Sequence, residues 1–150
     1  MELNWTCKSF DALSGTEMYA MLQLRNEVFV VEQNCVYQDA DDKDQSAWHL
    51  CGWNGNALAA HCRILPAGVS FPDHPSIGRV VTSPLYRQGG HGRKLMQMAI
   101  QKTIEQFGDP VIIISAQLYL KAFYSSLGFT QTSDEYLEDG IPHIKMQYGR

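Results

Sequence analysis

The sequence lacks any apolar run close to the ~20 residues that a bilayer-spanning helix needs. Its amino terminus, Met1-Glu2-Leu3-Asn4-Trp5, also lacks the basic stretch followed by an apolar one that marks a secretory signal. These two absences predict a cytoplasmic protein that makes no use of a membrane.

Cysteine is scarce and irregularly spaced, at Cys7, Cys35, Cys51 and Cys62. No Cys-x-x-Cys pair occurs, so the common zinc and dithiol motifs are excluded. In a chain of this size and compartment, the four residues are expected to be free thiols, and no metal site is expected.

Positive charge is also in short supply. Twelve Lys and Arg residues face sixteen Asp and Glu residues, which gives a net charge of −4. Nucleic acid is therefore a poor partner, and a cationic or amine-bearing partner is mildly favoured.

The composition is that of a globular protein, since 45% of the 150 residues are hydrophobic and 19% are charged. A chain of this length can bury most of its apolar surface around one core, so a single domain over residues 1–150 is expected.

The pattern of apolar residues predicts an α/β fold. Period-two alternation and buried runs predict strands over residues 3–10, 47–53, 57–65, 77–82, 111–116, 129–136 and 141–148. Helical spacing predicts helices over 16–29 and 90–107 and a short one over 120–127, and Ser14 with Glu17 has the spacing of a capping box. Asn54-Gly55 is a hairpin turn, and the apolar run 111–114 reads as a central strand parallel to 77–82.

Two segments after the first helix differ in character. Residues 30–37 are too apolar for a solvated linker and are expected to pack against the protein. The acidic stretch 39–44 is expected to be a surface loop, as charge runs usually are. Trp48 and Trp53 are interpreted as core residues.

The stretch from Ser83 to Lys94 is the strongest functional signal. It joins a strand to a helix through three glycines, Gly89, Gly90 and Gly92, with basic residues beside them. Glycine lets the backbone approach a bulky ligand, and the free amides of a helix's first turn attract an anion, so a phosphate or pyrophosphate is the expected occupant. Neither a P-loop nor a Rossmann fingerprint fits the spacing.

The spacing Arg87-x-x-Gly90-x-Gly92 resembles the pyrophosphate-binding motif of the GCN5-related N-acetyltransferase (GNAT) family. A second stretch, Phe123-Tyr124-Ser125-Ser126-Leu127-Gly128-Phe129, and the order of elements extend this resemblance over nearly the whole chain. Within the family, the chain is similar to the small bacterial ElaA-type proteins. The similarity lies in four short sequence segments, residues 22–25, 28–35, 77–81 and 138–144. The resemblance implies a mixed central sheet of about seven strands with flanking helices.

The resemblance also implies acetyl-CoA as co-substrate, bound between the strands 77–82 and 111–116. The backbone of Val80, Val81 and Thr82 would then pair with the pantetheine arm. The pyrophosphate would be held by the amides of six consecutive residues, Gln88, Gly89, Gly90, His91, Gly92 and Arg93. Arg87 would either bridge phosphates or solvate a loop, and Gln117 stands where many members carry an asparagine that contacts pantetheine or substrate.

For catalysis, Tyr124 matches the family tyrosine that protonates the departing CoA thiolate; the alternative is a core tyrosine. The base that takes a proton from the amine is left open among His49, Glu32, Glu138 and His143. His143 is preferred because histidine titrates near neutral pH and because residues 141–144 lie on the last strand, near the expected cleft. The expected function is direct acetyl transfer from acetyl-CoA to an amine.

The sequence leaves two rival functions open, a non-catalytic acyl-CoA-binding or sensing module and an unrelated binder of nucleotide phosphates. The acceptor is not identified by the sequence, although acidic residues in two loops could attract an ammonium group. Oligomeric state is equally open, with a homodimer among the alternatives.

Overall fold

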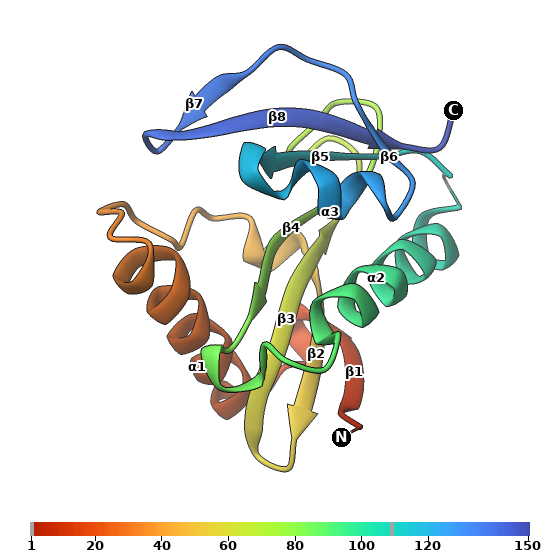
Figure 1. The fold of residues 1–150 in the computed structure, drawn as a ribbon. Coiled ribbons are helices and arrows are strands. Elements are labelled where there is room, and N and C mark those ends of the chain that lie inside the picture. Colours follow the sequence, from red (N-terminus) through yellow and green to blue (C-terminus); the bar gives the residue numbers. More distant parts are fainter. Residues whose placement is uncertain (1, 109) are drawn as a thin grey trace.

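The computed structural model describes residues 2–108 and 110–150 and has the predicted α/β architecture (Figure 1). A mixed eight-stranded sheet runs in the order β1-β2-β3-β4-β5-β8-β6, and β7 pairs with β8 beside β6. The strands are β1 (Asn4–Ser9), β2 (Trp48–Asn54), β3 (Ala57–Leu65), β4 (Ser76–Thr82), β5 (Ile112–Gln117), β6 (Phe129–Gln131), β7 (Tyr136–Glu138) and β8 (Ile141–Tyr148). In the described ranges, no helix combines the length and apolar character that a bilayer crossing requires.

The helices cover the two faces of the sheet (Figure 1). They are α1 (Gly15–Arg25), which continues as the π-helix η2 (Asn26–Glu32), α2 (His91–Phe107) and α3 (Lys121–Ser125). Short 3-10 turns are η1 (Phe10–Ala12), η3 (Asp44–Ser46), η4 (Pro84–Tyr86) and η5 (Leu118–Leu120).

Each of the two long helices buries one apolar face. On one side of the sheet, α2 places Leu95, Met96 and Ala99 in the larger core with residues of β2, β3 and β5. On the other side, α1 and η2 place Met21 and Val28 in a smaller core with residues of β2, β3 and β4. The sheet between them is therefore covered on both faces. The prediction that β5 itself is covered on both sides is wrong, because Ile112, Ile114 and Ala116 are buried in the larger core whereas the alternate residues of the strand are only half-buried.

The predicted start of the first helix is confirmed, but its second half has a different geometry. Ser14 and Glu17 form the capping box, since the Ser14 hydroxyl accepts from the Glu17 amide at 3.0 Å and the Ser14 amide donates to Glu17 Oε1 at 2.8 Å. After Arg25 the chain winds as a π-helix, a rare form that is often found at functional sites.

The prediction that residues 30–37 pack against the protein is wrong for half of the segment, since residues 31, 32, 34 and 36 are exposed. Val31 is 73% exposed and Val36 is 98% exposed, whereas Cys35 is buried. The π-helix continues to Glu32 and turns Val31 outward, and Asn34 then adopts a left-handed φ of 50°. From Gln33 onward, alternate residues of the segment are buried or half-buried.

The acidic stretch 39–44 is not the solvated loop that its composition predicts. Asp39 and Asp44 are buried, at 5% and 7% exposure. Arg25 donates from Nε to Asp39 at 2.7 Å and from Nη1 to Asp44 at 2.8 Å. Arg63 adds bonds to Asp41 and Asp44, and Arg79 adds bonds to Asp39 and Asp41. We call these six residues, Arg25, Arg63, Arg79, Asp39, Asp41 and Asp44, the arginine–aspartate cluster.

The end of the chain contains two short strands where one was predicted over residues 129–136. Both β6 and β7 pair with β8, but Ser133 interrupts them, because its hydroxyl accepts from the Lys145 amide at 2.9 Å. The polar residues Ser133 to Glu135 thus form a bend between two strands, and the sheet has eight strands instead of about seven.

The sheet opens in its middle. The parallel register of β4 and β5 pairs Ser76 with Ile113, where the Ile113 amide donates to the Pro75 carbonyl at 3.1 Å. Beyond this point the two strands separate (Figure 1). In β4, Arg79 has a left-handed φ of 51°, and the register with β3 shifts next to it between His61 and Arg63, as in a β-bulge.

Candidate functional site

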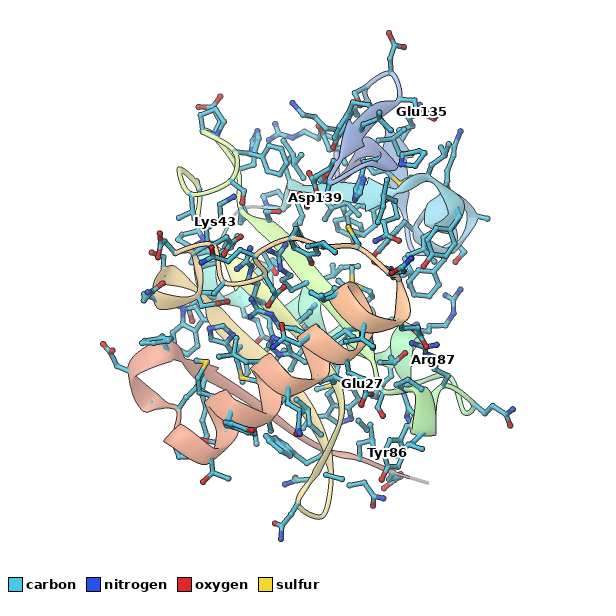
Figure 2. The ribbon with its side chains drawn as sticks, turned by 90° about the vertical axis from the view of Figure 1, so that its left-hand side faces the viewer. Glu27, Lys43, Tyr86, Arg87, Glu135 and Asp139 are labelled. Atoms are coloured by element: carbon cyan, nitrogen blue, oxygen red, sulfur yellow. The ribbon has the colours of Figure 1, made fainter. Side chains whose placement is uncertain are left out.

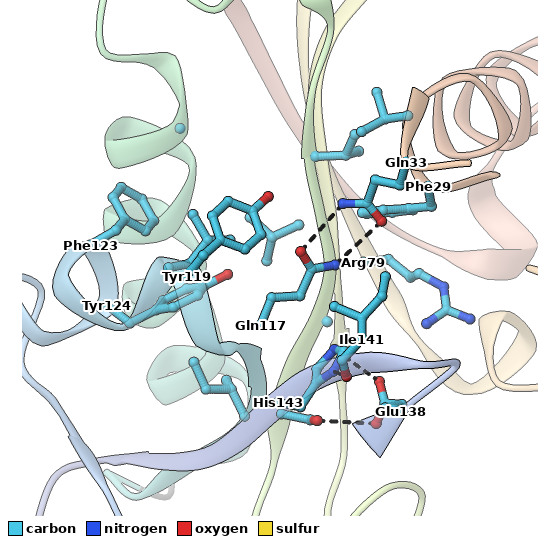
Figure 3. A pocket seen from close by; sticks show the side chains of 18 of the residues that line it. Phe29, Gln33, Arg79, Gln117, Tyr119, Phe123, Tyr124, Glu138, Ile141 and His143 are labelled. Atoms are coloured by element: carbon cyan, nitrogen blue, oxygen red, sulfur yellow. Dashed lines mark hydrogen bonds and ion pairs between the residues drawn. The ribbon is translucent and has the colours of Figure 1, made fainter. Parts of the chain in front are cut away.

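The gap between β4 and β5 is the mouth of a cavity of about 470 Å³. Its walls come from β4 and β5, the π-helix η2, the segment η5–α3 and the turn between β7 and β8. Figure 3 shows Tyr119 and Tyr124 on one side, Glu138 and His143 on the other, and Gln117 between them.

The glycine turn lies at one end of this cavity, at the start of α2. Gly89 and Gly90 have φ of 112° and 74°, a conformation that side chains disfavour, and Gly90 is the residue before the helix. The first bond within the helix runs from the Lys94 amide to the Gly90 carbonyl, so the amides of the first turn are left for another acceptor. This geometry suits an anion.

Gly92 is the member of the turn that lines the cavity. A Cβ placed there would lie 3.7 Å from Thr82 Cγ2, which is an ordinary contact, so the protein itself leaves room for a side chain. Gly90 differs, since its positive φ would strain any substitution. A larger residue at Gly92 would therefore fill ligand space without disturbing the turn.

Arg87 does not stand free beside the turn. Its guanidinium donates to both oxygens of Glu32, which also lines the cavity, with Nη1 2.9 Å from Oε2. This hydrogen bond lowers the pKa of Glu32 and raises that of Arg87. Both side chains are about 40% exposed, at 42% and 41%, so an anionic ligand could compete with Glu32 for the guanidinium.

The structure brings most of the predicted site residues together. The eight that line the cavity are Val80, Val81, Thr82, Arg87, Gly92, Gln117, Tyr124 and His143. The predicted residues outside its lining are Gln88, Gly89, Gly90, His91 and Arg93. The Arg93 side chain instead donates to Ser126 Oγ at 2.6 Å and lies over the Phe123 ring.

Tyr124 has its ring in the core and lines the cavity. The side chain is 6% exposed, and its ring meets those of Phe123 and Phe129 edge-on at 5.2 and 5.9 Å between centroids. Burial raises its pKa above the ordinary value of 10, so the phenol keeps its proton at neutral pH. The two sequence interpretations, core residue and proton donor, are compatible in this position.

Gln117 is joined across the cavity to Gln33, a residue that sequence reasoning did not single out. The two side-chain amides exchange hydrogen bonds at 3.3 and 3.4 Å. Gln33 follows the π-helix directly, and Gln117 ends β5. The pair thus connects the two walls of the cavity (Figure 3).

His143 is buried, at 5% exposure, and its ring stacks on Tyr136. Nδ1 lies 2.7 Å from the Ile141 carbonyl oxygen, which can only accept, so Nδ1 carries a proton. Nε2 is left facing Glu138 Oε2 at 3.4 Å. The strand β8 fixes the position of His143 by pairing it with Gln117 on one side and Tyr136 on the other.

The other base candidates differ in their surroundings. His49 is fully buried outside the cavity lining, with Nε2 2.9 Å from the Asp44 carbonyl oxygen, so it is no candidate. Glu32 is held by Arg87, which weakens it as a base. Glu138 lines the cavity beside His143.

Ser115 and Arg79 also line the cavity and were missed as site residues. For Ser115 a signal existed, since the buried residues of β5 alternate with half-buried ones and Ser115 shares the half-buried face with Gln117. For Arg79 none existed, because its orientation depends on the bulge in β4. Within residues 2–108 and 110–150, no cluster of three His, Cys, Asp or Glu side chains could hold a metal ion.

Comparison with known proteins defines the class to which this fold and site belong. The model of the acetyltransferase (GNAT) domain matches residues 16–149, so the chain belongs to the GNAT acetyltransferase family. Its relatives include a UPF0039 protein of Synechocystis sp., which is 45% identical over 147 residues, covering 97% of this chain and 95% of the relative. The predicted resemblance to this family and to its ElaA-type branch is confirmed.

Two solved structures extend the match to the whole fold. The crystal structure of an acyl-CoA N-acyltransferase from Pseudomonas aeruginosa superposes with a TM-score of 0.92 at 43% identity, covering 98% of this chain and 99% of that one. The crystal structure of Escherichia coli ElaA gives 0.91 at 38% identity, with the same coverage. The predicted α/β fold class is thereby confirmed.

Proposed function

We propose that this protein transfers an acetyl group from acetyl-CoA to an amine by direct attack of the amine on the thioester. The observation that supports this most is the position of the cavity, which opens where β4 and β5 separate and ends at the glycine turn. A donor with a peptide-like arm and a pyrophosphate has both chemical features that this shape can bind.

The β4 side of the cavity would hold the donor. The backbone of Val80, Val81 and Thr82 would pair with the amides of the pantetheine arm, as strand edges do with extended peptides. The pyrophosphate would take the first-turn amides of α2 and draw Arg87 away from Glu32. Gln117 would contact the arm in place of its bond to Gln33.

The chemistry needs a base and an acid on opposite sides of the reacting carbon. A neutral amine attacks the thioester carbonyl and the carbon–nitrogen bond forms. The nitrogen of the tetrahedral adduct then loses a proton to water, and the carbon–sulfur bond breaks as the sulfur takes a proton. Tyr124 would supply that proton, because burial keeps its phenol protonated. His143 would take the proton that the amine must lose before attack.

The test is release of free CoA from acetyl-CoA with a panel of amines that includes primary alkylamines, amino acids and aniline. Tyr124→Phe keeps the ring contacts and should lower kcat by about 10²- to 10⁴-fold without changing acetyl-CoA affinity. Gly92→Val should remove most of that affinity in calorimetry, while thermal unfolding stays within a few degrees of the parent protein.

The outcomes separate the alternatives. A protein that binds acetyl-CoA but releases no CoA with any amine is a sensing module, and one that binds ADP-ribose as tightly as CoA is a general nucleotide binder. If Gly92→Val binds acetyl-CoA like the parent protein, the glycine turn is not the pyrophosphate site.

A further inference from the structure

Four polar side chains form a connected chain at the end of the cavity opposite the glycine turn. They are Tyr136 and Glu138 on β7, Ser115 on β5 and His143 on β8, and all of them except Tyr136 line the cavity. Ser115 Oγ lies 2.6 Å from the Tyr136 hydroxyl and donates to Glu138 Oε1 at 3.1 Å. Three neighbouring strands therefore hold the group.

The direction of each hydrogen bond in this chain is determined by its chemistry. A carboxylate only accepts, so the Ser115 hydroxyl donates its one proton to Glu138. The hydroxyl of Tyr136 must therefore donate to Ser115 Oγ. Burial raises the pKa of Tyr136, which keeps that proton in place. Oxygen Oε1 of Glu138 is thus supplied with a donor, and Oε2 is directed at His143.

The neutral form of His143 presents an acceptor at the same place. Its one ring proton is on Nδ1, held by the Ile141 carbonyl, so Nε2 carries a lone pair. Two acceptors, Nε2 and Glu138 Oε2, then face each other at 3.4 Å without a proton between them. Such a pair is stable only when a proton or a donor group joins it.

We infer that Glu138 and His143 together form the site that receives the acceptor as an ammonium ion and removes its proton. This rests on the proposed function. One N–H of the ammonium would bond to Glu138 Oε2 and another to His143 Nε2. The second N–H bond then breaks, its electrons stay on the nitrogen as the attacking pair, and the proton forms an imidazolium beside the Glu138 carboxylate.

The surroundings favour this assignment over a purely structural pair. Glu138 is 47% exposed, so a proton that reaches it can leave to water. The charged and titratable groups that line this end are Asp139 of the β7–β8 turn, Tyr37 after η2, and Arg79 of β4. Arg79 is neutralised by Asp39 and Asp41, which leaves the local charge negative. The site therefore selects primary alkylamines, which are cationic at neutral pH.

Glu138→Gln tests the assignment, because it removes the charge and keeps an acceptor for Ser115. We expect kcat/KM to fall by about 10- to 100-fold for the primary alkylamine of the panel with the highest kcat/KM, the loss of a hydrogen bond to a charged group. For aniline, which is neutral at pH 7.5, we expect a change of less than about threefold. Ser115 and Tyr136 position the Glu138 carboxylate. Ser115→Ala and Tyr136→Phe should therefore also lower kcat/KM for the alkylamine more than for aniline, by a smaller factor than Glu138→Gln.

Glu135→Gln is the matched control, since it removes the same charge from an exposed residue of the same region outside the cavity lining. Figure 2 shows Glu135 at the outer end of this region and Asp139 nearer the middle of the molecule. Calorimetry should give unchanged acetyl-CoA affinity in every variant.

Each outcome bears on one proposal. If the parent protein uses no amine, the proposed function fails and this assignment fails with it. If the parent protein is active and Glu138→Gln slows alkylamine and aniline equally, or slows neither, the assignment is wrong and the function stands. If Glu135→Gln lowers kcat/KM for the alkylamine as much as Glu138→Gln does, the effect is one of general surface charge and the assignment is wrong.

Discussion

The two acidic regions of this protein have similar composition and opposite surroundings. In segment 39–44, the carboxylates of the arginine–aspartate cluster receive bonds from three arginines and lie mostly buried. Near the β7–β8 turn, Glu138 and Asp139 are exposed and line the cavity, and Glu138 has a hydroxyl and an imidazole as neighbours. The comparison shows that an acidic stretch becomes structural when basic partners saturate it, and stays available for a cationic ligand when they do not.

The arginine–aspartate cluster should respond most strongly to the loss of one partner. Arg25→Met leaves Asp39 and Asp44 buried with fewer donors, and removal of one member of a buried pair costs about 3–5 kcal/mol. Urea unfolding should show this as a lower midpoint at unchanged slope. Asp42→Asn, at an exposed position of the same segment, should change the free energy of unfolding by less than about 0.5 kcal/mol. A loss below about 0.5 kcal/mol in both variants would mean that the segment is a solvated loop.

Low pH should also lower the free energy of unfolding, through two buried histidines beside the arginine–aspartate cluster. His49 and His61 stack at 5.6 Å between centroids, and burial lowers the pKa of each. The unfolded chain then binds their protons first, so their contribution to stability is complete above about pH 6.5 and falls with decreasing pH below it. The loss is about 1.4 kcal/mol per pH unit for each histidine that titrates.

Thermal and urea unfolding between pH 7.5 and 5 would measure this slope. His61→Asn keeps a donor for the Leu50 carbonyl. Whatever its effect on stability at pH 7.5, it should reduce the slope of unfolding free energy against pH by the contribution of one proton, about 1.4 kcal/mol per pH unit. A slope that is the same in parent and variant would show that His61 does not titrate on unfolding.

The smallest expected effect concerns attraction of the acceptor at a distance. Because arginines neutralise segment 39–44, steering must come from the β7–β8 turn, and Asp139→Asn removes one charge there while Asn tolerates the left-handed φ of 52°. Coulomb attraction across ~8 Å of water predicts about a twofold rise in KM for an alkylamine at low salt. The rise should vanish near 0.5 M salt, and Asp42→Asn should leave KM unchanged. A KM that is insensitive to salt and to Asp139→Asn would exclude steering.

The sequence was sufficient for the parts of the fold that depend on local patterns. The Asn54-Gly55 hairpin, the capping box at Ser14 and the glycine turn before α2 all lie where they were predicted. Each is determined by residues within a few positions of one another, so a single chain segment contains the information.

The errors at the arginine–aspartate cluster and at Gln33 have the opposite property, because they depend on residues far away in the sequence. Asp39 and Asp44 are buried because of arginines 14 to 40 positions away, and no local pattern records those partners. Gln33 was missed because its partner Gln117 is 84 positions distant. The cavity residues on β5 and β8 could be proposed from family resemblance, but the pairing of His143 with Glu138 depends on the register of β7 and β8.

The separation of β4 from β5 also gives the sheet two open edges in its interior. Unpaired strand edges usually invite pairing with another chain, and proteins protect them by covering or shortening them. Here α1 with η2 and α2 with α3 stand on either side of the gap (Figure 1), and the Gln33–Gln117 pair crosses it. A second β-sheet is too broad to enter a space of about 470 Å³, whereas a single extended arm can. The same geometry that would admit a ligand to these edges thus protects the protein from aggregation through them.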